Sequence, residues 1–175
     1  MAPPPRITPS ARRWIRISVV ASLVLAAWIV IDQLALSPTT INGCRIEPGA
    51  TCTYANLVEQ DLTGVDMSDS DIYKGRLTGA SLVGADFSES SMTQARLDGA
   101  DLSGANFSGA QLFGTNLSGA TAVGTNFVGA NLKFADFTGA DLTGADLSGA
   151  EDEGLKLDGA ILDGTTLPDG SVSAG

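Results

Sequence analysis

The chain has 175 residues, with 20 acidic and 10 basic side chains and no histidine, and its formal net charge is −10. The lack of histidine excludes catalysis by Ser-His-Asp or Cys-His systems and every zinc site that uses histidine. The acidic balance argues against binding to the phosphates of nucleic acids, and the length suits about one domain.

The first part of the chain is predicted to contain two segments. Residues 1–13 are rich in Pro, Ser and Arg and have no apolar periodicity, which predicts a disordered basic tail. Residues 14–36 are predicted to form one transmembrane helix that serves as a signal anchor. Its apolar part, 17–36, would be about 30 Å long as a helix, which matches the hydrocarbon thickness of a bilayer.

The arginines around this helix predict its orientation. Four of them precede residue 17, whereas only Arg45 lies in the twenty residues after the helix. The positive-inside rule then places the N-terminus in the cytoplasm and the remainder of the chain outside it. The alternative is a signal peptide that is cleaved near Ser37, in which case the remainder of the chain is secreted.

Residues 37–49 are predicted to be a linker that ends in a disulfide cap. Cys44 and Cys52 are the only cysteines of the chain. An even number of cysteines at short spacing in an exported segment predicts one disulfide. Two unrelated buried thiols are the alternative, and a metal site made by two cysteines would need further ligands that the neighbouring sequence lacks.

A period of five residues dominates the chain from Leu57 to Leu167. Of the 23 positions in this frame, 21 are Leu, Phe, Met or Ile, and the exceptions are Ala122 and Asp152. Neither a helix nor a long strand places residues at this period on one side. The chain must therefore turn in every unit, so that stacked coils bury an apolar core that no single unit could bury alone.

The repeated unit resembles the pentapeptide repeat family. Segments such as 100–104 (ADLSG) and 140–144 (ADLTG) carry the motif A(D/N)LxG. The resemblance implies an all-β solenoid over residues 50–167, a right-handed parallel quadrilateral β-helix of about six coils. Residues 168–175 are predicted to be a flexible tail.

Four sides per coil make residues twenty apart direct neighbours, which gives three predictions about the interior. The side chains of Phe87, Phe107 and Phe127 should stack on one inner face. Cys52 falls in the same frame and should point inward at the first coil. Asp152 stands where an inward Leu belongs, so we expect a backbone bulge there or hydrogen bonds from turn amides to its carboxylate.

A narrow rod with a packed interior offers no cleft, so the sequence predicts no enzyme, no catalytic residues, no cofactor and no metal site. The preferred interpretation is a non-enzymatic, membrane-tethered extracytoplasmic scaffold or protein-binding module with an unknown protein partner in the cell envelope and no nucleic-acid partner. The alternative comes from the family resemblance: some cytoplasmic members imitate duplex DNA and bind DNA gyrase, which the acidic charge would fit.

Exposed aromatic side chains are the best candidates for a partner surface. Tyr73, Phe113 and Phe134 follow the inward position by one or two residues and belong to one side of the coil, so we expect them to face solvent. The alternative is that they are separate rings that lie flat over glycine-rich turns.

Overall fold

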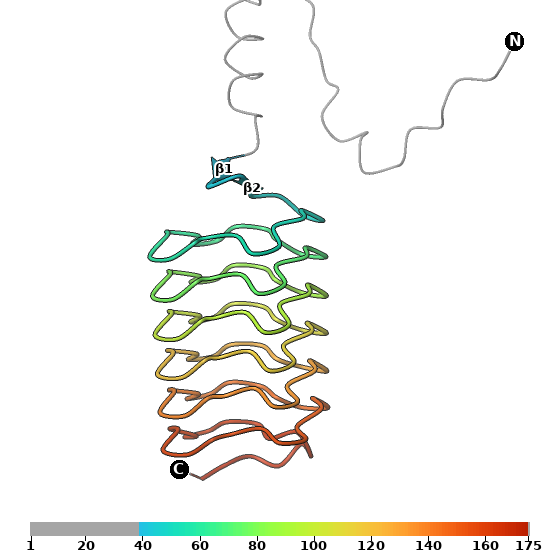
Figure 1. Cartoon of the computed structure of the whole chain (residues 1–175). Helices are drawn as coiled ribbons and strands as arrows, with labels where there is room; N and C mark the ends of the chain where they lie inside the picture. The colour runs from blue at the N-terminus through green and yellow to red at the C-terminus, as the bar shows by residue number, and fades with distance from the viewer. Residues whose placement is uncertain (1–38, 175) are drawn as a thin grey trace, which may run out of the picture. The chain divides into compact units, whose positions relative to one another are not determined.

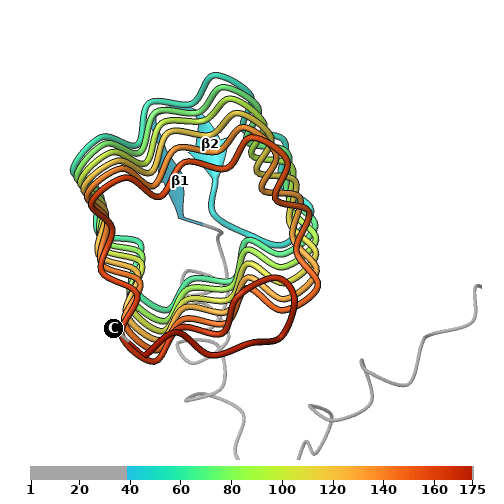
Figure 2. The same cartoon turned by 90° about the horizontal axis from the view of Figure 1, so that it is seen from below.

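The computed structural model describes residues 39–174. The predicted tail (1–13) and signal anchor (14–36) lie outside the described residues. No helix within the described part of the chain is long and apolar enough to span a membrane. The described residues form an all-β solenoid whose coils stack along one axis (Figure 1) and have four sides in the end-on view (Figure 2).

A short hairpin precedes the solenoid. Strands β1 (Thr40–Ile41) and β2 (Cys44–Arg45) are antiparallel. The two turn residues, Asn42 and Gly43, have φ values of 49° and 83°, as a type I′ turn requires. Only a linker and a cap are predicted for this segment from the sequence, although Asn-Gly between two short strands is a strong hairpin signal.

Residues twenty apart pair through parallel bridges along the whole solenoid, from Thr51 and Asp71 to Asp146 and Thr166. Four five-residue units therefore complete one coil, as the sequence predicts. Each bridge continues a backbone ladder between successive coils, because every coil alone lacks partners for its amides and carbonyls.

Each five-residue unit turns the chain in the same way. In one example, the amide of Ala85 donates to the carbonyl oxygen of Leu82 at 3.0 Å, and Gly84 between them has φ of 63°. A positive φ at the third residue of such a turn defines type II, which favours glycine because it has no Cβ. The recurring glycine of the motif is explained by this corner.

The four sides of the solenoid are named here by one inward residue each: the Leu57, Leu62, Met67 and Ile72 sides. From Leu57 to Leu147 the large inward side chains of all four sides are buried, and so are most of the small residues two positions before them. In the last coil the inward Leu157, Leu162 and Leu167 are only half-buried. On the Met67 side, Phe87 stacks on Phe107 with ring centroids 5.3 Å apart, and Phe107 stacks on Phe127 at 5.5 Å. The predicted phenylalanine stack is confirmed.

Three buried threonines occupy small-residue positions of the core. The hydroxyls of Thr115, Thr125 and Thr165 donate to carbonyl oxygens of the preceding coil at 2.7–2.9 Å. A buried hydroxyl without a partner would cost about 1–3 kcal/mol. Hydrogen bonds to the ladder therefore explain why threonine can replace alanine at these positions.

The expected defect at Asp152 does not occur. The amide of Leu132 donates to the carbonyl oxygen of Glu151 at 2.8 Å, and the turn after Asp152 closes normally through the amide of Leu155 at 3.0 Å. The backbone does not bulge, and the Asp152 side chain is exposed. It lies in the last coil, where no further coil covers it, so its charge stays in water and carries no burial cost.

The C-terminal residues also differ from the prediction. They were expected to form a flexible tail over 168–175, but the chain folds back onto the last coil. The amide of Leu167 donates to the carbonyl oxygen of Ser171 at 2.7 Å, and that of Ser173 donates to Thr165 at 2.8 Å. Val172 pairs antiparallel with Thr166. This return covers part of the final coil and satisfies some of its backbone groups.

Candidate interaction surface

The predicted partner residues all lie at corners of the Ile72 side, but with different exposure. Phe113 is 38% exposed and Phe134 is 52% exposed, whereas Tyr73 is half-buried. Their positions after the inward residue explain this placement, because the two turn residues of each unit project away from the core.

Phe113 and Phe134 form one contact across two successive coils. Their ring centroids are 5.5 Å apart and the ring planes meet at 71°, an edge-to-face arrangement. Such pairs are favoured by the aromatic quadrupole. The Phe134 ring also lies over Gly154 of the next coil, where an added Cβ would come within 2.6 Å of it. These two rings make an exposed apolar patch, called here the Phe113–Phe134 patch.

Tyr73 does not join this patch. It packs edge-to-face against Tyr54 of the coil above, with centroids 5.7 Å apart, and the Nζ of Lys74 lies 5.1 Å from the centre of its ring. Hydrogen bonding to the Tyr73 side chain raises the pKa of Lys74. Tyr54 is 65% exposed and is not among the predicted partner residues, although its offset of eighty residues from Phe134 places both in the same corner position.

The Ile72 side is unusual because most of its corners place a residue other than glycine at the positive φ. Most corners of the repeat place glycine at the positive φ, but seven place another residue there. Four of these seven belong to the Ile72 side: Tyr54, Lys74, Gln94 and Phe134. A left-handed conformation costs a residue with a Cβ roughly 1–2 kcal/mol, and bulky residues rarely adopt it. This side therefore displays large side chains at positions where the fold alone favours glycine.

We expect Gly154→Ala to destabilise the protein more than Gly144→Ala does. Both glycines have φ of 66–69°, but only Gly154 has a ring against it. The shared backbone cost is about 1 kcal/mol, and displacing Phe134 should add roughly 0.5–1.5 kcal/mol. Urea unfolding of both variants, with and without Phe134→Ser, measures the coupling. Equal costs for the two glycines in the presence of Phe134 would contradict the contact.

Charge is divided unequally among the four sides. Within residues 50–174 all five cationic side chains lie on the Leu57 and Ile72 sides: Lys74, Arg76, Arg96, Lys133 and Lys156. The Leu62 and Met67 sides carry ten acidic side chains and no cation within the same residues: Asp61, Asp66, Asp69, Asp86, Glu89, Asp101, Asp141, Asp146, Asp163 and Asp169. The solenoid thus has two acidic sides and two sides of mixed charge.

The acidic side chains serve mainly in their own turns. The Oδ1 of Asp86 accepts hydrogen bonds from the amide and the hydroxyl of Ser88, at 2.9 and 2.7 Å, and from the Nδ2 of Asn106. The Ser88 bonds lower the pKa of Asp86. Asp141 is held in the same way by Thr143. Within residues 39–174 no group of three acidic or sulfur side chains could hold a metal ion.

Comparison with protein families agrees with this architecture. The model for pentapeptide repeats matches residues 49–79, 76–109 and 110–149, with eight copies in all. The chain belongs to the pentapeptide repeat family. The described solenoid and the family's right-handed quadrilateral β-helix are the same all-β architecture. A comparison with curated proteins found no match.

Solved structures of other pentapeptide repeat proteins resemble the chain. A protein from the Arabidopsis thaliana thylakoid lumen is 36% identical over 52% of this chain and 63% of its own, with a TM-score of 0.51. HetL from the cyanobacterium Nostoc, involved in the regulation of heterocyst differentiation, is 25% identical over 70% of this chain and 76% of its own, with a TM-score of 0.37. The fluoroquinolone resistance protein QnrB1 is 18% identical over 65% of this chain and 84% of its own, with a TM-score of 0.31.

Proposed function

We propose that this pentapeptide repeat protein is a non-enzymatic, protein-binding module that is tethered to the membrane, with its solenoid outside the cytoplasm. The observation that carries the binding role is the Phe113–Phe134 patch. Two aromatic rings contact each other in solvent on a rod whose other large apolar side chains are mostly buried between Leu57 and Leu147. Aromatic side chains are enriched among the residues that dominate the energy of protein interfaces.

The surroundings of the patch fit a partner with a mixed polar surface. Lys133 precedes Phe134 in the same corner, and its Nζ lies 2.7 Å from a carboxylate oxygen of Glu151. An exposed ion pair of this kind contributes less than about 1 kcal/mol to stability. Little stability is therefore lost when either side chain pairs with a charge on a binding partner instead. The patch therefore offers an apolar centre with a charged rim, the usual anatomy of a protein interface.

Two features support the location. The apolar segment 17–36 and the arginines before it match a signal anchor. Cys44 and Cys52 are bonded to each other, and disulfides persist in oxidising compartments outside the cytoplasm. A signal peptide cleaved near Ser37 would leave the same solenoid secreted.

The test of the binding role is the double variant Phe113→Ser, Phe134→Ser. We expect it to weaken the capture of envelope proteins by the purified chain while thermal melting changes little. A matched control is Val123→Ser, Val128→Ser, which removes two side chains that are 38% and 39% exposed on other sides of the solenoid. If both double variants capture partners like the wild type, the patch is not a binding site.

The second candidate is a cytoplasmic mimic of DNA that binds DNA gyrase, and it is favoured by the ten uncompensated acidic side chains of the Leu62 and Met67 sides. The two proposals require opposite locations. A topology reporter fused after Gly175 separates them: activity outside the cytoplasm excludes the gyrase function, and activity inside it excludes the extracytoplasmic one.

A further inference from the structure

A cavity of about 290 Å³ lies at the N-terminal end of the solenoid, between the hairpin and the first coil. Its walls include Asn42, Thr51, Thr53 and Asn56, together with Tyr54 and the Cys44–Cys52 disulfide. The described residues that line it carry no charge, although the chain as a whole is strongly acidic. The cavity therefore has no preference for a cation or an anion.

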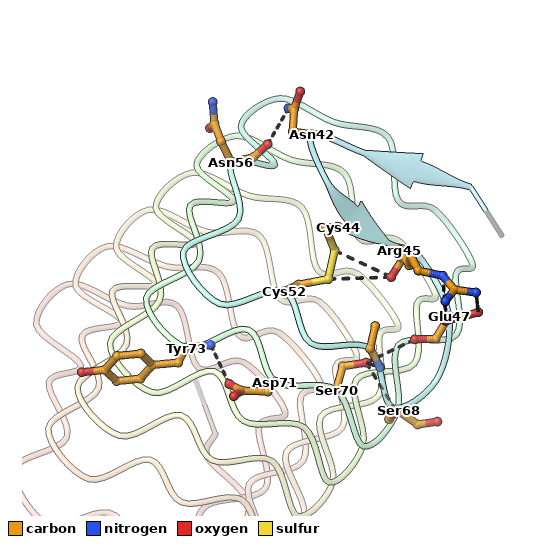
Figure 3. Close-up of a disulfide and its surroundings, with 11 residues drawn as sticks. Asn42, Cys44, Arg45, Glu47, Cys52, Asn56, Ser68, Ser70, Asp71 and Tyr73 are labelled. Atoms are coloured by element: carbon orange, nitrogen blue, oxygen red, sulfur yellow. Dashed lines mark hydrogen bonds and ion pairs between the residues drawn. A yellow bond between two sulfur atoms is a disulfide. The ribbon is translucent and has the colours of Figure 1, made fainter.

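Unpaired backbone groups border this cavity. In later coils the amides at equivalent positions, such as those of Asp71 and Arg76, donate to the coil above at 2.8 and 2.9 Å. The amides of Thr51 and Asn56 have no such partner among the described residues, because no coil precedes them. The hairpin satisfies only part of this edge: the Nδ2 of Asn42 donates to the carbonyl oxygen of Asn56 at 2.7 Å (Figure 3).

Tyr54 stands at the rim of the cavity, at a corner whose positive φ the fold needs but where the fold does not need a tyrosine. Its φ is 57°, at a corner where glycine is the common residue, and 65% of it is exposed. The edge-to-face contact with Tyr73 therefore offsets only part of the cost of the left-handed backbone. Backbone strain in an exposed aromatic residue points to a role outside folding.

We propose that this cavity binds a neutral sugar residue, with the pyranose ring against Tyr54 and its hydroxyls on the edge of the first coil. A purely apolar ligand would displace water from the Thr51 and Asn56 amides without offering them an acceptor, which is costly. A charged ligand would meet no opposite charge. Sugar hydroxyls both donate and accept hydrogen bonds, as the threonine hydroxyls and backbone groups here require, and the C–H face of the ring packs on an aromatic side chain.

The test is a titration of the purified full chain, kept free of glycosidic detergents, with glucose and N-acetylglucosamine while the backbone amides are followed by NMR. We expect saturable shifts at Thr51, Thr53 and Asn56 in the millimolar range. Glucuronate and glucosamine, the charged counterparts, should bind more weakly. A short uncharged peptide, trialanine, serves as the competing probe.

Tyr54→Gly separates binding from folding. It removes the ring and places at this corner a residue that adopts the positive φ without strain, so we expect about tenfold weaker sugar binding and a melting temperature that is unchanged or higher. Phe134→Gly is the matched control, because it makes the same change in the same corner position near the opposite end and should leave sugar binding intact. Thr53→Val removes one hydroxyl at a position where other units carry Val83 and Val123, and it should also weaken binding.

Three results would overturn the proposal. The first is the absence of saturable shifts with either neutral sugar. The second is equal sugar affinity in wild type, Tyr54→Gly and Thr53→Val. The third is tighter binding of trialanine than of the sugars at the same amides, which would assign the cavity to a peptide. None of these results depends on the Phe113–Phe134 patch, so they leave the proposed protein-binding function untouched.

Discussion

Replacing Leu117 with Asp is expected to unfold the solenoid around the substituted coil. Leu117 is fully buried on the Leu57 side, between Leu97 and Phe137, and its amide donates to the carbonyl oxygen of Asp136 at 2.7 Å. An unpaired carboxylate in this core costs at least several kcal/mol, a large share of the 5–15 kcal/mol that stabilises a typical domain. Circular dichroism during urea unfolding measures the loss.

A neighbouring substitution provides the control. Ser118→Asp introduces the same charge one residue later, at a corner position that Asp98 and Asp158 already occupy on the same side. We expect a change of less than about 0.5 kcal/mol there. A cooperative transition of Leu117→Asp that coincides with that of the wild type would refute the inward assignment of this frame. Amide exchange should further show that the lost protection centres on the coils next to residue 117.

The second large effect is expected from removal of the disulfide. Cys44 and Cys52 are bonded, with their Cα atoms 5.0 Å apart, and both are buried between the hairpin and the first coil. The bond closes a loop with a sequence separation of 8. Closing such a loop is worth about 2.5 kcal/mol in the chain-entropy account. We expect Cys44→Ser, Cys52→Ser to lose about this much unfolding free energy.

Reduction provides the comparison for this double variant. The wild type in excess dithiothreitol should unfold at the urea concentration of the Ser variant, whose own transition should not respond to the reductant. Mass spectrometry of the native protein, alkylated without prior reduction, tests the bond directly. Labelling of both thiols under those conditions would show that the protein carries no disulfide.

The two ends of the solenoid differ because different segments close them. At the N-terminal end the hairpin is covalently tied to Cys52, yet it leaves a cavity beside Tyr54. At the C-terminal end the return through Val172 covers only part of the last coil, and Asp152 faces water. Charged side chains at an open sheet edge oppose stacking on a second copy. The carboxylate of Asp152 is well placed for that effect.

The period of five residues determined most of the interior without any structure. It placed the large apolar residues inward, made residues twenty apart neighbours, and so predicted the contacts of Phe87, Phe107 and Phe127. It could do so because each unit repeats one turn, and the direction of every Cβ follows from its place in that turn. Local chemistry was sufficient here because all units obey the same backbone geometry.

The tertiary structure decided what happens at corners and at ends. The period predicted that Tyr73, Phe113 and Phe134 share a side, but only side-chain packing between coils could pair Phe113 with Phe134 and Tyr73 with Tyr54. The tertiary structure also decided that Asp152 stays exposed, because the environment of this side chain depends on whether another coil follows. A repeat determines the direction in which a side chain leaves the backbone, whereas its contacts depend on the neighbours above and below it.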